Sequence, residues 1–170
     1  MVILSRRDRP PPVPAAEAAR VRAAVLRARR MRRAAVGRRL RLYAAVGLGS
    51  VIGGSLRWLA SEALRAALGP DFPWGTLCVN VSGSFLIGFY AAMAGPDGRL
   101  LAGPVQRQFV MTGFCGGFTT FSIFSLDTVL LVEAGDIRTA AAFVGASLAL
   151  WFAAVWAGFG FATRFNRLRR

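Results

Sequence analysis

Four apolar segments limit what this chain can fold into more than any other feature of the sequence. They cover residues 42–60, 75–94, 109–132 and 139–161, and each is close to the roughly 20 residues that a transmembrane helix needs. The stretches between them contain the glycine, proline and aspartate residues that are typical of turns. The sequence therefore predicts an all-α membrane protein, in which residues 41–170 form a domain of four transmembrane helices.

Residues 1–40 have a different composition from the rest of the chain. All 22 basic residues are arginines, and thirteen of them precede residue 42. This stretch has no apolar run long enough for a transmembrane helix or a secretory signal. We expect a basic tail, disordered or folded as a surface helix, that contacts anionic lipid, unless translation starts at Met31. The tail lacks a motif that selects a base sequence, so nucleic acid is not expected as a partner.

The residue inventory argues against an enzyme. The chain contains no histidine, which removes the usual general base and the commonest ligand of transition metals. Its two cysteines, Cys78 and Cys115, lie in separate apolar segments without the spacing of a metal-binding pair. We interpret both as small buried side chains.

The third apolar segment contains residues that an uninterrupted transmembrane helix avoids. Gly116 and Gly117 are followed by Thr119 and Thr120 near the middle of the segment. A break at this point would release carbonyl groups, which must then face protein, water or an ion, and a cation is a common partner for them. The pattern fits a helix that is broken in mid-membrane. It fits equally a kink in which threonine hydroxyls bond back to the preceding turn.

Aromatic and polar residues beside this point have two interpretations each. Phe121 and Phe124 are three residues apart and share a helix face, with the hydroxyls of Thr120 and Ser122 close by. Such a pair usually makes core or lipid contacts, but the positive edges of the rings can also favour an anion. The buried amide of Asn80 needs a partner, which is either a neighbouring helix or a small anion that exchanges part of its hydration shell for the amide.

Arg57 is the only arginine close to the apolar interior of the first segment. It either lies at the mouth of a water-filled vestibule or extends to the lipid headgroups. Two alternative functions are a small four-helix proton-coupled exporter and a non-transporting membrane adaptor. The exporter normally needs a carboxylate embedded in the membrane early in the chain, and the first segment has none before Glu62.

Three ordered motifs resemble the CrcB/Fluc family of fluoride channels. They are Gly-Gly-Ser-Leu-Arg-Trp at 53–58, Gly-Thr-Leu-Cys-Val-Asn at 75–80 and Thr-Gly-Phe-Cys-Gly-Gly-Phe-Thr-Thr-Phe-Ser at 112–122, and the resemblance covers about residues 43–161. It implies a dimer of antiparallel subunits with two fluoride pathways. Fluoride would leave the cell passively through them, which lowers its cytoplasmic concentration and toxicity.

The resemblance also implies roles for individual residues. A structural sodium ion, which is not transported, would be held by the backbone carbonyls of Gly116 and Thr119, and Arg57 would belong to the vestibule. The family carries a polar track on its fourth helix, but only one polar residue, Ser147, lies on the corresponding face here. Ile123 also stands where the family often has a hydroxyl residue. The expected fluoride pathway comprises Asn80, Thr120, Phe121, Ser122, Phe124 and Ser147.

The arginine distribution predicts one orientation in the cell membrane. With four spans, both termini and the middle loop share one side, where thirteen arginines precede residue 42, two lie in the loop and four follow residue 161. The opposite loops hold only Arg65 and Arg138. This bias predicts cytoplasmic termini. Because identical antiparallel chains need no orientation preference, one hypothesis is a heterodimer with an oppositely oriented homologue, and the alternative is a homodimer.

Overall fold

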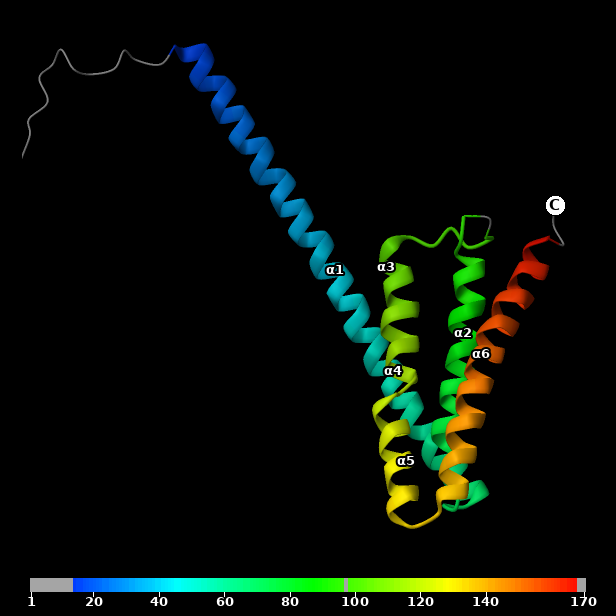
Figure 1. Cartoon of the computed structure of the whole chain (residues 1–170). Coiled ribbons are helices and arrows are strands. Elements are labelled where there is room, and N and C mark those ends of the chain that lie inside the picture. Colours follow the sequence, from blue (N-terminus) through cyan, green and yellow to red (C-terminus); the bar gives the residue numbers. More distant parts are fainter. Residues whose placement is uncertain (1–13, 97, 168–170) are drawn as a thin grey trace, which may run out of the picture. The chain divides into compact units, whose positions relative to one another are not determined.

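The computed structural model describes residues 14–96 and 98–167, and these residues are helical apart from short connections (Figure 1). Four helical stretches are long and apolar enough to cross a membrane: Ala19–Leu68, Trp74–Met93, Pro104–Glu133 and Ile137–Arg167. The prediction of an all-helical chain with four spanning helices is therefore confirmed. The elements are α1 (Ala15–Leu68), α2 (Trp74–Met93), α3 (Pro104–Arg107), η2 (Gln108–Cys115), α4 (Gly116–Phe118), α5 (Ser122–Glu133) and α6 (Ile137–Arg167).

Helix α1 is longer than the first apolar segment at both ends. The chain divides into two units, Met1–Leu40 and Arg41–Arg170, and the boundary between them falls inside this helix. The Ala- and Arg-rich stretch is thus helical from Ala15, whereas residues 1–13, with the prolines of the tail, lie outside the described residues. At the other end, α1 continues beyond residue 60 because its last residues are good helix formers, and Glu62 pairs with Arg65 at 3.2 Å.

The link between α5 and α6 is short because Asp136 bonds to the last turn of α5 and also caps the start of α6. Gly135 has a left-handed φ of 77°, and it donates to Val132 while Asp136 donates to Leu131, both at 3.0 Å, which ends α5. The Asp136 carboxylate then accepts the backbone N–H of Thr139 at 3.1 Å and caps α6. Hydrogen bonding from Thr139, through its side chain first and its backbone second, lowers the pKa of Asp136.

Glycines allow α2 and α6 to pack with their backbones in contact. A Cβ atom added at Gly88 would overlap the carbonyl oxygen of Val155, and one added at Gly158 would overlap the carbonyl oxygen of Phe85. The two helices therefore approach closely, which is how transmembrane helices associate where lipid provides no hydrophobic drive.

The third span packs against α1 in the same way. A Cβ at Gly49 would lie 2.5 Å from the carbonyl oxygen of Phe109, and one at Gly117 would lie 2.6 Å from that of Ser50. Because Gly117 belongs to α4, this contact fixes the end of α4 against the first span. It thereby positions the region where the candidate site is found.

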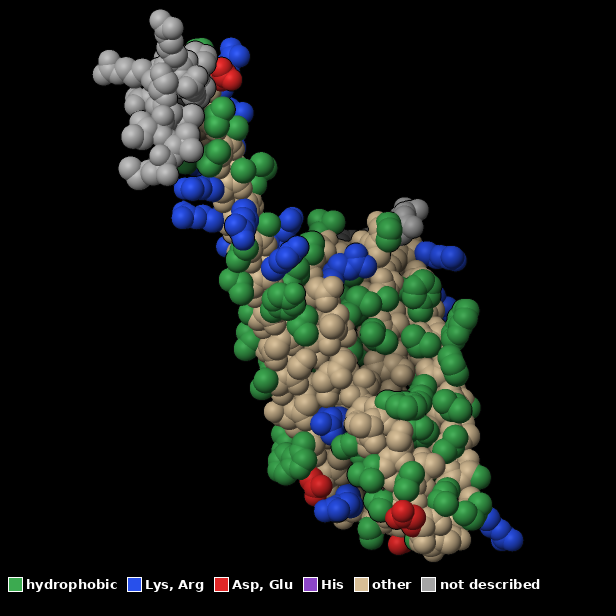
Figure 2. Space-filling view, turned by 60° about the vertical axis from the view of Figure 1, so that its left-hand side comes forward, with side chains coloured by type: hydrophobic (Ala, Val, Ile, Leu, Met, Phe, Trp, Pro, Cys, Tyr) green, Lys and Arg blue, Asp and Glu red, His purple; other side chains and the backbone are tan. Residues whose placement is uncertain are grey.

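The surface of residues 41–170 is consistent with a lipid environment. Large apolar side chains are exposed along the spans, among them Leu48, Phe152 and Trp156. Over this unit, Figure 2 shows charged side chains mainly toward the two ends and mostly uncharged side chains between them. Lipid is the solvent that would cover such a surface.

Candidate functional site

The helical path of the third span is interrupted between α4 and α5. Helix α4 ends at Phe118, Thr119 has an extended backbone with φ −87° and ψ 160°, and α5 begins at Ser122. The backbone N–H and the hydroxyl of Thr119 both donate to the carbonyl of Cys115, each at 2.9 Å. The back-bonding expected of a kink is thus present at Thr119, at the residue where the backbone leaves the helical conformation.

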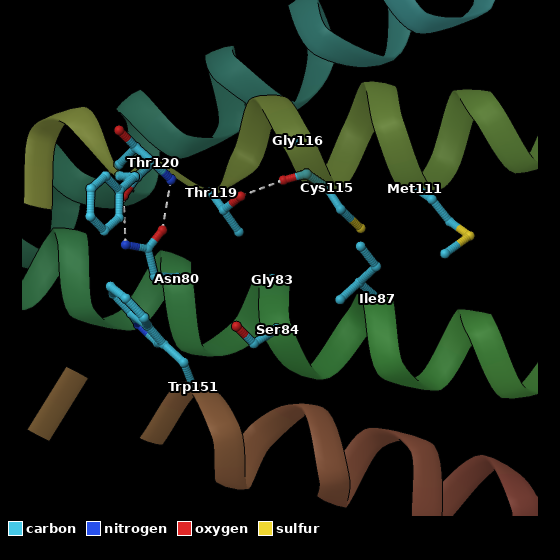
Figure 3. A pocket seen from close by; sticks show the side chains of 11 residues that line it. Asn80, Gly83, Ser84, Ile87, Met111, Cys115, Gly116, Thr119, Thr120 and Trp151 are labelled. Atoms are coloured by element: carbon cyan, nitrogen blue, oxygen red, sulfur yellow. Dashed lines mark hydrogen bonds between the residues drawn. The ribbon is translucent and has the colours of Figure 1, made fainter. Parts of the chain in front are cut away.

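Asn80 of α2 holds this interruption with two hydrogen bonds. Its Nδ2 donates to the carbonyl oxygen of Thr120 at 2.8 Å, and the backbone N–H of Thr120 donates to Asn80 Oδ1 at 2.7 Å (Figure 3). The side chain is only 4% exposed, and it pairs with Thr120 as a second peptide group would. Of the two partners considered for this amide, the one present is the neighbouring span, and one of the two N–H groups of Asn80 remains for another acceptor.

The same hydrogen bonds affect the two carbonyls predicted to hold sodium. In a continuous α-helix, the N–H groups of Thr120 and Ile123 would bond to the carbonyls of Gly116 and Thr119. Here the Thr120 N–H donates to Asn80, and the Ile123 N–H donates to the Thr120 hydroxyl at 3.2 Å. The Gly116 and Thr119 carbonyls therefore lose the donors that a regular helix would give them.

Arg57 reaches the interruption from α1. Its Nε donates to the carbonyl oxygen of Gly117 at 3.3 Å, and the side chain is half-buried. A guanidinium is well placed at this point because the carbonyl end of a helix carries partial negative charge. Arg57 therefore binds a backbone carbonyl next to the interruption, while its role in a vestibule stays a prediction.

The two phenylalanines share a face, as predicted, but their environments differ. Their ring centroids are 5.6 Å apart. Phe121 is 71% exposed, whereas Phe124 is 7% exposed and packs against Phe143 at 5.2 Å and Trp151 at 4.9 Å. Phe124 is therefore part of the core, and Phe121 is free to contact a second molecule or an ion.

A groove of about 280 Å³ brings several of the expected site residues together (Figure 3). Five of them, Asn80, Gly116, Thr119, Thr120 and Phe121, line it, whereas Ser122, Phe124, Ser147 and Arg57 do not. The Ser122 hydroxyl lies 3.2 Å from that of Thr120, so it is adjacent to the groove wall. The complete lining is Asn80, Gly83, Ser84, Ile87, Met111, Cys115, Gly116, Thr119, Thr120, Phe121 and Trp151.

Helix α6 contributes a residue that the sequence reasoning missed. Trp151 lines the groove, and its Nε1 is buried with no hydrogen-bond partner among the described residues. The hydroxyl of Ser147, one turn earlier, also has no hydrogen-bond partner among the described residues, and the Ser147 side chain is fully buried. The four-residue spacing was the available signal, since it places both side chains on one face of the helix.

A second missed contact joins α2 to α5. Thr76 is buried, and its hydroxyl donates to the Asp127 carboxylate at 2.6 Å. Asp127 follows Phe124 by three residues, so the carboxylate lies on the same side of α5 as the buried ring. The two residues lie 51 positions apart in the sequence, so only the fold shows that they are partners.

The comparison with known proteins agrees with the resemblance. Residues 44–159 match the family model described as "CrcB-like protein, Camphor Resistance (CrcB)". A protein of Rhodopseudomonas palustris named fluoride-specific ion channel FluC 1 is 58% identical over 131 residues, which cover 77% of this chain and 93% of that protein. A FluC 1 of Bradyrhizobium diazoefficiens is 54% identical over 129 residues, covering 76% and 89%. A FluC of Opitutus terrae is 48% identical over 128 residues, covering 75% and 97%.

Proposed function

This chain belongs to the CrcB-like family, and we propose on that basis that it is a fluoride-specific ion channel of the cell membrane. The observation that carries the proposal is the groove, in which the backbone held by Asn80 and the exposed ring of Phe121 meet between apolar spans. Channel activity also fits the expectation that the chain is not an enzyme, since its relatives are named as ion channels.

The groove lining suits an anion that must bind weakly enough to leave again. The remaining N–H of Asn80 and the hydroxyls of Ser84 and Thr120 can donate hydrogen bonds, and the edge of the Phe121 ring is electropositive. None of the described residues that line the groove is charged, so binding depends on dipoles. A proton-coupled exporter would need a titratable carboxylate in this lining. The described lining residues include no carboxylate, which favours passive flow of fluoride out of the cell.

A structural sodium ion fits the interruption. The carbonyls of Gly116 and Thr119 are neutral oxygen donors without their helical partners, which is the ligand type that a hard cation prefers. Among residues 14–96 and 98–167, no cluster of three His, Cys, Asp or Glu side chains offers another metal site. When bound, sodium would supply a fixed positive charge, and Asn80 and Thr120 keep the two carbonyls available for it.

We further propose that the chain acts as an antiparallel dimer. Two carbonyls are only part of a sodium coordination shell, so a second chain would supply the remaining oxygens and cover the exposed Phe121 ring. The arginine bias favours cytoplasmic termini and hence a heterodimer with an oppositely oriented homologue, with a homodimer as the alternative.

Thiol labelling would test the orientation. A cysteine added after residue 170 would be labelled with a membrane-impermeant reagent in intact cells and in lysed cells, with the untagged chain as background. We expect labelling only after lysis. Comparable labelling before and after lysis, in cells that express this chain alone, would exclude a fixed orientation and with it the reason for a heterodimer.

Fluoride efflux from liposomes tests the channel itself. The purified chain, alone and with a co-expressed oppositely oriented homologue, would be reconstituted and efflux followed with a fluoride electrode. We expect fluoride efflux without chloride efflux, and no dependence on an imposed proton gradient. Absence of fluoride flux from both preparations would refute the proposed function.

A further inference from the structure

We propose that one face of the arginine-rich part of α1 binds the phosphate groups of anionic phospholipids, through a cluster formed by Arg29, Arg32 and Arg33. These residues belong to the first unit of the chain, Met1–Leu40, and the proposal does not depend on fluoride conduction. The sequence predicts contact with anionic lipid only for the tail as a whole. The structure narrows that contact to three side chains on one helix.

The first argument is a hollow that these side chains form on the helix surface. Arg29, Arg32, Arg33 and Val36 line a shallow hollow of about 490 Å³. Residues three and four positions apart are neighbours on a helix, so the three guanidinium groups can reach one ligand together. A guanidinium donates paired hydrogen bonds that match the oxygens of a phosphate group. The spacing therefore suits a phosphate better than a single exposed arginine would.

The second argument is that the chain supplies no negative charge for this cluster. Among residues 14–40 the only acidic residue is Glu17, which lies about three helical turns before Arg29. The arginines of this stretch are all exposed, and Figure 2 shows arginine side chains along this part of the chain. Like charges three or four residues apart destabilise a helix. An external anion would relieve the repulsion within the cluster.

The third argument favours a lipid surface over other polyanions. Val25, Val36 and Leu40 share a face with Arg29, because the spacings of four, seven and four residues return to one side of a helix. These three apolar side chains are exposed by 45%, 50% and 62%. A bilayer surface offers phosphates beside acyl chains, so it can contact both kinds of side chain, whereas nucleic acid and free phosphate offer nothing apolar.

The fourth argument is the position of the cluster in the chain. Arg33 lies nine positions before residue 42, where the first apolar segment begins. Basic clusters that directly precede a transmembrane helix bind the anionic lipids of the same membrane. Gly37 lies between the cluster and that segment, and a Cβ added there would meet nothing within 4 Å. Because glycine is a poor helix former, the helix can bend at Gly37 and bring the guanidinium groups to the headgroups.

Hydrogen exchange of the full chain tests the proposal. The protein would be placed in nanodiscs of phosphatidylcholine, with and without phosphatidylglycerol, and exchange of the amides of residues 20–40 followed by mass spectrometry. An arginine near an anionic surface contributes about fivefold, so three contribute on the order of a hundredfold, and we expect exchange to slow at least tenfold with phosphatidylglycerol. High salt should reverse the effect. Equal exchange in the two lipids would overturn the proposal.

Two variants with the same change in charge separate the cluster from general attraction. One replaces the cluster, as Arg29→Gln, Arg32→Gln and Arg33→Gln. The control replaces three arginines of the opposite face, which are seven and eleven residues apart and cannot share one phosphate: Arg20→Gln, Arg27→Gln and Arg38→Gln. Glutamine and arginine have similar helix propensity. We expect the cluster variant to lose the slowing and the control to keep most of it. Equal loss in both variants would overturn the assignment to the cluster.

Soluble anions test the choice of a lipid as the partner. Sodium phosphate and single-stranded RNA would each be added, in excess over the lipid phosphate and at physiological salt, to the protein in phosphatidylcholine nanodiscs. We expect both to slow the exchange of residues 20–40 less than phosphatidylglycerol does. Slowing by either anion that equals the effect of the lipid, and that the cluster variant abolishes, would overturn the proposal in favour of that anion.

Discussion

Replacing Asn80 by leucine tests the part of the site on which both ions depend. Leucine is similar in volume but cannot hydrogen-bond, so the change removes both bonds to the Thr120 backbone, at 2.8 Å and 2.7 Å. Asn80 is 4% exposed, so no water replaces the lost partner. Each buried group left unpaired costs about 1–3 kcal/mol, and the two groups of Thr120 together cost about 2–6 kcal/mol.

The chain can recover part of this free energy by forming a helical hydrogen bond again, but that bond removes the proposed sodium site. The Thr120 N–H can return to the Gly116 carbonyl and extend α4 by a residue, which regains about 1 kcal/mol. One of the two released carbonyls is then occupied. We therefore expect Asn80→Leu to lose both fluoride flux and the stabilisation that sodium gives to the native state.

The assay is thermal unfolding in detergent, in sodium chloride and in the chloride of a bulky organic cation, together with fluoride efflux. Asn80→Asp is the matched variant, since it keeps an acceptor for the Thr120 N–H and introduces negative charge into the groove. It should retain the sodium-dependent shift in Tm while losing fluoride flux. If Asn80→Leu unfolds at the wild-type temperature, shifts with sodium as the wild type does and conducts fluoride, the reasoning is wrong.

Three further predictions concern the aromatic pair, the helix contact and the turn. Phe121→Ala should suppress fluoride flux with little loss of stability because Phe121 is exposed, whereas Phe124→Ala should also lower the free energy of unfolding by about 3–5 kcal/mol because its ring is buried; unchanged flux in both would make them ordinary apolar contacts. Gly158→Ala should lower Tm because its Cβ meets the α2 backbone, while Gly160→Ala, which has open space, should keep or raise Tm; equal Tm values would refute the close approach. The pKa of Asp136 is lower in the folded chain than its ordinary value of 3.8. The ionised carboxylate therefore stabilises the folded state above pH 3.8, and this contribution is lost as the pH falls through the pKa of the folded chain. The difference in Tm between wild type and Asp136→Ala should therefore shrink below about pH 4, and a constant difference would contradict it.

The fold could be predicted from the sequence because its determinants are local and repeated. Four runs of about 20 apolar residues predict four helices in lipid, and Gly69 and Gly135 mark two of the turns by adopting positive φ. The apolar segment that marks the first span ends at residue 60, before the helix does. Hydropathy falls there, but the helix propensity of the following residues continues the helix to Leu68.

The candidate site could be predicted only as a set of residues. Sequence order indicates that Asn80 and the residues near Gly116 are unusual in an apolar segment, but it cannot show that the amide bonds to Thr120, forty residues away. The contact of Arg57 with Gly117 depends on close packing of glycines between two spans, which no periodicity reports. Trp151 was overlooked because a tryptophan in an apolar helix is usually a packing residue, and its unpaired N–H is visible only in three dimensions.

The interruption directs two backbone N–H groups away from the carbonyls to which a regular helix would bond them. Breaking a helix normally leaves donors and acceptors in equal number. Here Asn80 Oδ1 and the Thr120 hydroxyl accept the N–H groups of Thr120 and Ile123, which frees the carbonyls of Gly116 and Thr119. Freed carbonyl oxygens create a negative potential that would repel an anion in the neighbouring groove. In the proposed channel, the sodium ion and the Arg57 guanidinium on the Gly117 carbonyl both offset that potential, so the cation is needed for fluoride to enter the groove as well as for assembly.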